Sequence, residues 1–282
     1  MSWNQTSPGA PTVSPTARAL FVVDFSWLSD ARYRSTGRRG ALTVTETNRR
    51  ELQAGQVERT YIVADRGERP VTRGWFHVGA TIAFALASTV LITFAWMTLR
   101  WPEALGVTIY GAGIITLFGV SGMYHRWPWR SASTVQWWRR TDHATIAVFI
   151  AATYTPLCVI AFEPRTAGIM LAVAWGGAIL GAILNLVWIN HPRWLDLVVY
   201  IGLGWIIVPL VPTLWAGTGP VVVTLIFLGG VIYTLGALVY GFKWPGRQAR
   251  YYGYHEHFHT ATIVAAILHL VAIWMVVVAA SN

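Results

Sequence analysis

The sequence has few charged residues and almost no cysteine. Only 12% of its 282 residues are charged, 55% are hydrophobic, and Cys158 is the single cysteine. One cysteine excludes an intrachain disulfide and a Cys-x-x-Cys metal site, and we interpret Cys158 as a small apolar residue of a membrane segment. A mean hydropathy of +0.48 does not describe a soluble domain, so the composition predicts a polytopic membrane protein.

Long apolar stretches account for most of the chain after residue 75. Each is close to the ~20 residues that a helix needs to cross the hydrocarbon core of a bilayer. The predicted segments are 76–98, 104–125, 142–162, 166–189, 195–214, 220–241 and 258–280. The predicted fold class is therefore an all-α membrane protein, a bundle of seven transmembrane helices.

The basic residues predict how this bundle is oriented. Eleven of the 21 Lys and Arg residues precede residue 76, and eight lie in the loops after the second, fourth and sixth segments. Only Arg100 and Arg165 lie in the other loops. The positive-inside rule then predicts a cytoplasmic N-terminus and an outside C-terminus in the inner (plasma) membrane. The net charge of +9 follows from this topology and requires no nucleic acid partner.

The first seventy residues differ from the rest in composition. They are rich in Pro, Ser, Thr, Gly and Arg, and their one short apolar patch, 19–28, is interrupted by Asp24. The patch is too short to span a membrane, and the pattern of a signal peptide is not visible. We predict a cytoplasmic, partly disordered tail over 1–70 and a transmembrane domain over 71–282.

Polar side chains that suit a metal ion gather at the predicted cytoplasmic ends of three segments. His255 and His259 are four residues apart and share one face of the last helix. Ser121 and His125 have the same spacing at the end of the second segment, and Asp142 opens the third. The topology places all five at one membrane depth.

These residue types suit a catalytic zinc ion. Three histidines leave a fourth position for water, and a nearby carboxylate can accept the proton of that water. Asp142 is the candidate general base, and Ser121 is a candidate to orient a ligand or to donate to a developing oxyanion.

Structural explanations of the same residues stay open. Histidines at helix ends are often interfacial, and Asp142 could be an acid at a helix N-terminus with Thr141 as the cap. Among the other histidines, His257 and His143 are expected to face away from the site, His191 to be solvated, and His77 to be interfacial or a spare ligand. His269 lies about 21 Å along the helix from His255, so it cannot bind the same ion and is expected to bond within the bundle. Asp196 is expected to be a cap or to support the site from behind.

Several motifs resemble the hemolysin III family, the bacterial branch of the progestin and adipoQ receptor superfamily. The motifs are Ser121-Gly122-Met123-Tyr124-His125, Asp142-His143 with Thr153-Tyr154-Thr155-Pro156, Gly230-Val231-Ile232-Tyr233-Thr234-Leu235-Gly236, and His255-Glu256-His257-Phe258-His259. Arg73-Gly74-Trp75-Phe76-His77 resembles the start of the family's first helix. The resemblance covers roughly residues 70–280.

The resemblance implies a seven-helix bundle that holds zinc near the cytoplasmic face. It implies His125, His255 and His259 as ligands, Asp142 on the zinc-bound water, and Ser121 beside the site. Relatives of the wider group include alkaline ceramidases, which points to a zinc-dependent hydrolase of lipid amides or esters with a ceramide-like or other acyl-lipid substrate, acting in membrane lipid homeostasis.

Two other functions stay open at this stage. One is a pore-forming hemolysin (cytolysin), which would need a polar lumen or an amphipathic inserting segment. The other is a receptor or sensor of membrane state in which zinc is structural. The sequence identifies neither the lipid nor the oligomeric state.

Overall fold

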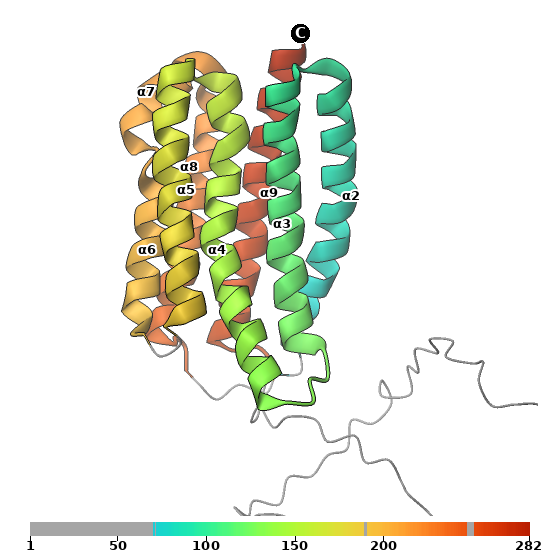
Figure 1. Cartoon of the computed structure of the whole chain (residues 1–282), viewed down its shortest axis with the longest axis vertical. Helices are drawn as coiled ribbons and strands as arrows, with labels where there is room; N and C mark the ends of the chain where they lie inside the picture. The colour runs from blue at the N-terminus through green and yellow to red at the C-terminus, as the bar shows by residue number, and fades with distance from the viewer. Residues whose placement is uncertain (1–69, 71, 189–190, 247–250) are drawn as a thin grey trace, which may run out of the picture. The chain divides into compact units, whose positions relative to one another are not determined.

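The structure is a computed structural model that describes residues 70, 72–188, 191–246 and 251–282. The described residues form an all-helical bundle without strands (Figure 1). The tail predicted for 1–70 lies outside the described residues, apart from Pro70.

Seven helical segments are long and apolar enough to cross a membrane, which confirms the predicted fold class. They are α2 (Trp75–Thr98), α3 (Trp101–Arg126), α4 (Ala132–Ala161), α5 (Pro164–Val187), the broken segment Trp194–Thr218, α8 (Pro220–Phe242) and α9 (Tyr254–Ser281). The broken segment comprises α6 (Arg193–Trp205), the 3₁₀ turn η2 (Val208–Leu210) and α7 (Val211–Thr218).

The interruption of the fifth segment has a local cause. Pro209 and Pro212 lie just after α6, and a proline lacks the N–H that would continue the helical hydrogen bonds. The prediction of one helix over 195–214 was therefore wrong in its continuity.

The third segment begins earlier than its hydropathy predicts. Ser131 caps α4, because its Oγ accepts a hydrogen bond from the Thr134 backbone N–H at 3.1 Å. The prediction of 142–162 thus missed the first ten residues of this helix, where polar residues conceal the helical pattern. The interpretation of Thr141 as a helix cap was wrong, and Asp142 lies in the interior of α4.

Helix α4 is central to the packing. It contacts α3 and α5 closely, and also α6 and α9. One of its faces contributes Phe149 and Leu157 to a core shared with α2, α3 and α9. The other contributes Tyr154 and Cys158 to a core shared with α5, α6, α7 and α8. Cys158 is fully buried, as expected for a small apolar residue.

Because neighbouring segments run in opposite directions, α3 ends and α9 begins at the same end of the bundle. This is the lower end in Figure 1, where α2 and α4 also start. We call it the site end, and it carries the candidate residues.

Candidate metal centre

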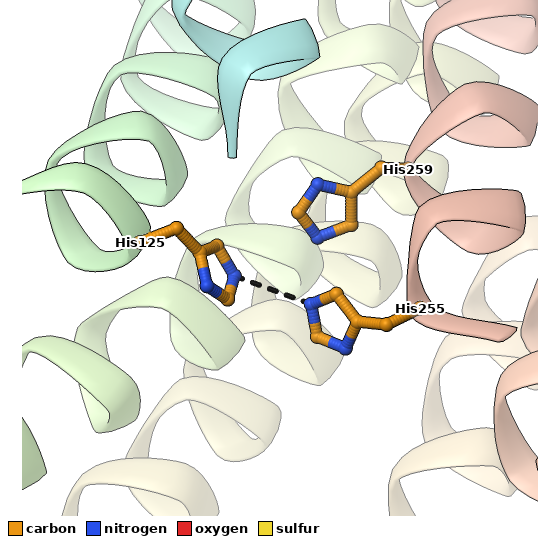
Figure 2. Close-up of side chains that lie close together, drawn as sticks. All are labelled: His125, His255 and His259. Carbon is orange, nitrogen blue, oxygen red and sulfur yellow. Dashed lines mark hydrogen bonds between the residues drawn. The ribbon is translucent and has the colours of Figure 1, made fainter. Parts of the chain in front are cut away.

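Three histidines from two helices converge at the site end. His125 is the penultimate residue of α3, and His255 and His259 lie in the first two turns of α9. One ring nitrogen from each lies within 4.8 Å of the others (Figure 2). His125 and His259 are buried and His255 is half-buried. The structure therefore brings these three predicted residues together.

The spacing of the nitrogens suits a tetrahedral ion. The Nε2 atoms of His125 and His255 are 3.2 Å apart, as the dashed line in Figure 2 marks, and the two rings meet edge-on. Two nitrogens that bind one tetrahedral zinc at its usual bond length lie about 3.3 Å apart. The three imidazole donors and the spacing of this pair thus fit the ion that the sequence implied.

Asp142 and Ser121 complete the centre. The Asp142 Oδ2 atom lies 3.8 Å from His125 Nε2, and Ser121 and Asp142 both line the same cavity. Ser121 is buried, one turn before His125 on the same helix. The two predicted catalytic residues therefore lie beside the three histidines, with the carboxylate positioned between α3 and α4.

An ion pair holds the start of α9 in place. Arg73, just before α2, pairs through its Nε with Glu256, and its second guanidinium nitrogen lies 3.5 Å from the other carboxylate oxygen. That oxygen also accepts the Gly253 N–H at 2.9 Å, which caps the first turn of α9. Because Glu256 lies beside His255, this contact fixes the turn that carries two of the three histidines.

His77 is buried against the centre rather than interfacial. Its ring stacks on that of His259, with centroids 3.8 Å apart, and meets Phe118 edge-on. Neither ring nitrogen of His77 has a hydrogen-bond partner. The expectation of an interfacial residue was wrong, and His77 is not one of the three grouped histidines.

Asp196 anchors a second polar cluster next to the centre. Its carboxylate lies 2.9 Å from His191 Nε2 and 3.8 Å from His143 Nδ1, and it accepts from Asn185 at 3.1 Å. The His191 side chain is only 6% exposed, so the expectation of a solvated residue was wrong. Asp196 is linked to the centre through His143, because His143 directly follows Asp142 in α4.

The two remaining histidines lie where the spacing predicts. His257 packs edge-on against Tyr252 and is outside the grouped histidines. The Nε2 atom of His269 lies 3.1 Å from the Ile226 carbonyl oxygen of α8, so His269 bonds within the bundle as expected.

A cavity opens from the metal centre into the bundle. It has a volume of about 420 Å³, and its walls come from α3, α4, α6, α7, α8 and α9. Asp142, His255 and His259 line one end, and the rest of the wall is mostly apolar, including Leu157 and Phe227. This volume and lining are those of a site for an apolar small molecule.

Sequence reasoning missed the residues that position the histidines. Arg73 and Glu256 were noted only as parts of motifs. Gly253 and Glu256 have the spacing of a capping box, and this pattern could have indicated that Glu256 caps the start of α9. Gly74 was likewise seen only as part of a motif, yet a Cβ there would lie 2.5 Å from the Cβ of His125. Its role depends on a contact between helices that no local pattern encodes.

The fold and the site define a seven-helix membrane protein with a buried candidate metal centre of three histidines and a carboxylate. The family model described as "Haemolysin-III related" matches residues 66–270, and the chain belongs to this family.

Characterised relatives agree with this assignment. The chain is 26% identical over 141 residues to "Hemolysin-3 homolog" of Bacillus subtilis (strain 168), covering 50% of this chain and 65% of that protein. It is 25% identical over 181 residues to "Hemolysin-3" of Bacillus cereus, covering 64% of this chain and 80% of that protein. It is also 23% identical over 217 residues to "Progestin and adipoQ receptor-like protein 1" of Caenorhabditis elegans, covering 69% of this chain and 49% of that protein.

Proposed function

We propose that the protein is a zinc-dependent hydrolase that cleaves an amide or ester bond of a membrane lipid within the bundle. The observation that supports this most is that Asp142, His255 and His259 line one end of a cavity with otherwise mostly apolar walls, and that His125 lies within 4.8 Å of the other two histidines. A lipid chain would occupy the apolar part while its carbonyl group lies at the histidines.

His125, His255 and His259 would hold the zinc ion. When bound, zinc supplies a Lewis acid that polarises a carbonyl group and makes a water molecule more acidic.

The protein's own residues perform the remaining tasks. Asp142 accepts a proton at its carboxylate, and the Ser121 hydroxyl, which lines the same cavity, orients a ligand or donates to a developing oxyanion. His77 covers one face of His259 and so limits the positions that this ring can take. The apolar walls exclude bulk water from the reacting carbonyl group.

The proposed location is the inner (plasma) membrane, with the site end facing the cytoplasm. The proposed substrates are ceramide-like or other acyl lipids, and the proposed role is membrane lipid homeostasis.

The metal content of the detergent-purified protein tests the centre. Elemental mass spectrometry is expected to find about one zinc per chain, as a single tetrahedral site requires. His125→Ala and the double variant His255→Ala/His259→Ala are expected to lose it. His257→Ala is the matched control, because His257 lies in the same turn but packs against Tyr252. If zinc persists in both ligand variants, the proposed metal site is wrong.

Turnover tests the chemistry separately from the metal. Asp142→Asn keeps the shape of the side chain but not its basicity, so zinc is expected to stay while hydrolysis of acyl lipids falls by roughly 10²- to 10⁴-fold. Glu163→Gln, at the opposite end of the bundle, is the control. Unchanged hydrolysis by Asp142→Asn contradicts the proposed role of this carboxylate.

The names of the relatives suggest two other roles, a hemolysin and a receptor. A pore would need a polar lumen, whereas the cavity wall is mostly apolar. A receptor with structural zinc would bind the metal without turning over any lipid. The zinc and hydrolysis measurements together distinguish this receptor role from the hydrolase.

A further inference from the structure

Two polar atoms in the wall of the cavity are left without a partner, far from the metal centre. They are Nδ1 of His269, on α9, and the hydroxyl oxygen of Tyr233, on α8. Both residues line the cavity, and their rings meet edge-on with centroids 5.5 Å apart. Leaving a buried donor or acceptor unpaired costs more free energy than one hydrogen bond contributes on balance, so such atoms call for a partner.

The hydrogen bond of His269 fixes which nitrogen is available. The Ile226 carbonyl can only accept, so Nε2 of His269 carries the proton at this 3.1 Å contact. In the neutral ring Nδ1 is then an acceptor. Tyr233 supplies a hydroxyl that can donate or accept.

The packing around His269 leaves space for its ring at this position. A Cβ on Gly229 would lie 2.4 Å from the His269 ring, so only glycine permits the close approach of α8. The imidazole therefore occupies a defined place beside Tyr233.

Several other polar groups along the apolar part of the cavity, away from His77 and the histidine cluster, are already satisfied. The hydroxyls of Thr153, Thr234 and Thr262 donate to carbonyls one turn earlier in their own helices. The Tyr154 hydroxyl donates to the carbonyls of Leu203 and Gly204. His269 and Tyr233 therefore differ from their neighbours in offering an acceptor and a hydroxyl to a molecule in the cavity.

We infer that His269 and Tyr233 form a second polar subsite that binds a hydroxyl group on the chain of an acyl lipid whose carboxyl-derived end lies at the metal centre. A hydroxyl group donates to Nδ1 of His269 and accepts from Tyr233, so it satisfies both atoms at once. The inference rests on the proposed function in one respect, the placement of the lipid's carbonyl end at the histidines.

The length of α9 gives the position of that hydroxyl. His269 follows His259 by ten residues and His255 by fourteen, which corresponds to about 15 to 21 Å along the helix. At about 1.2 Å per bond of an extended chain, this distance corresponds to roughly 12 to 17 bonds. A hydroxyl in the outer half of an 18-carbon chain, roughly 12 bonds from the carboxylate oxygen as at carbon 12, reaches the subsite, and one next to the carboxyl group does not.

Competition binding with fatty acids tests the inference on the full-length protein in detergent. Radiolabelled octadecanoic acid is displaced by unlabelled octadecanoic acid, by its 12-hydroxy derivative and by its 2-hydroxy derivative. The 12-hydroxy acid is expected to bind roughly five- to tenfold more tightly than octadecanoic acid, the value of about one hydrogen bond, and the 2-hydroxy acid is not.

Two variants show whether His269 and Tyr233 cause the preference. Tyr233→Phe and His269→Phe keep the aromatic rings and are expected to bring the affinity ratio of the 12-hydroxy to the unsubstituted acid to about one. Tyr110→Phe is the matched control, because its hydroxyl is buried and also unpartnered but does not line the cavity.

The outcomes separate this inference from the hydrolase proposal. Equal affinities for the three acids, a preference that survives both variants, or no binding of any acid overturns the subsite. A preference lost in both variants supports it even if the protein contains no zinc or hydrolyses no lipid, since neither is needed for the binding ratio.

Discussion

Gly74 shows how one residue without a side chain sets the position of a candidate ligand. Its φ of 79° lies in the left-handed region, which residues with a Cβ rarely adopt. A Cβ there would also meet the Cβ of His125 at 2.5 Å. The turn before α2 and the end of α3 can therefore approach only through glycine.

Gly74→Ala is expected to weaken zinc binding and to lower the apparent melting temperature. The left-handed backbone alone costs about 1–2 kcal/mol with alanine, and the contact with His125 adds to it. Gly79→Ala, inside α2, is the control, because a Cβ there meets nothing within 4 Å. Zinc titration and thermal unfolding in detergent measure both effects. Equal behaviour of the two variants contradicts the role of Gly74.

His191 is a residue whose charge is set by its neighbours. Partial burial lowers its pKa, but the Trp188 carbonyl and the Asp196 carboxylate oppose this, and the net effect raises the pKa above 6.5. Arg139 acts in the opposite direction to Asp196.

The raised pKa predicts a pH dependence of stability. A group whose pKa is higher in the folded state stabilises the protein fully below the unfolded pKa of 6.5, and this stabilisation is lost as the pH rises through the folded pKa. The melting temperature is therefore expected to fall as the pH rises above 6.5, and to fall less in His191→Gln. NMR titration of ¹³C-labelled histidine checks the pKa directly. A His191 pKa at or below 6.5 would falsify the assignment.

At the scale of elements, the ion pair of Arg73 and Glu256 joins the start of α2 to the start of α9. The Glu256 side chain is 2% exposed and that of Arg73 is 16% exposed, so loss of one partner leaves a poorly solvated charge. The first turn of α9, with His255, depends on this contact and on the cap at Gly253.

Arg73→Met and Glu256→Met are each expected to destabilise the protein by about 3 kcal/mol and to weaken zinc binding. The double variant is expected to lose less than the sum of the two, because no unpaired charge remains. Thermal unfolding and zinc titration of the unmodified protein, the two single variants and the double variant form a double-mutant cycle. Additive losses would show that the two side chains act independently.

The helix α4 illustrates what local patterns reveal and conceal. Its apolar part was predicted from residue 142, because the preceding turns contain Arg139 and Arg140 and resemble a loop. The helix nevertheless starts at Ala132, since Ser131 caps it and Trp129 stacks on Trp138 with ring centroids 4.7 Å apart. Tertiary contacts and a cap thus extend a helix beyond the limits of its hydropathy.

At the scale of the whole molecule, the distribution of basic residues predicts that the site end faces the cytoplasm. The single cysteine makes this testable, because Cys158→Ser removes the only native thiol. Pro128 and Arg165 are exposed, the first near the site end and the second at the opposite end.

Pro128→Cys and Arg165→Cys in that background are expected to differ in their labelling. A membrane-impermeant maleimide added to intact cells is expected to react with the cysteine at 165 and to reach the one at 128 only after permeabilisation, in line with the positive-inside rule. The opposite pattern would reverse the topology and place the metal centre on the outside.

The sequence alone determined that the chain has seven apolar segments and that His125, His255 and His259, with Ser121 and Asp142, share one end of them. Both results depend on local quantities, hydropathy over about 20 residues and the helical repeat, which contacts between helices do not alter. Only the tertiary structure decided that Gly74 packs against His125, that Arg73 pairs with Glu256, that His77 stacks on His259 and that Asp196 holds His191. Each of these contacts joins residues from different helices or loops, and its existence depends on how the helices pack, which no periodicity along one segment contains.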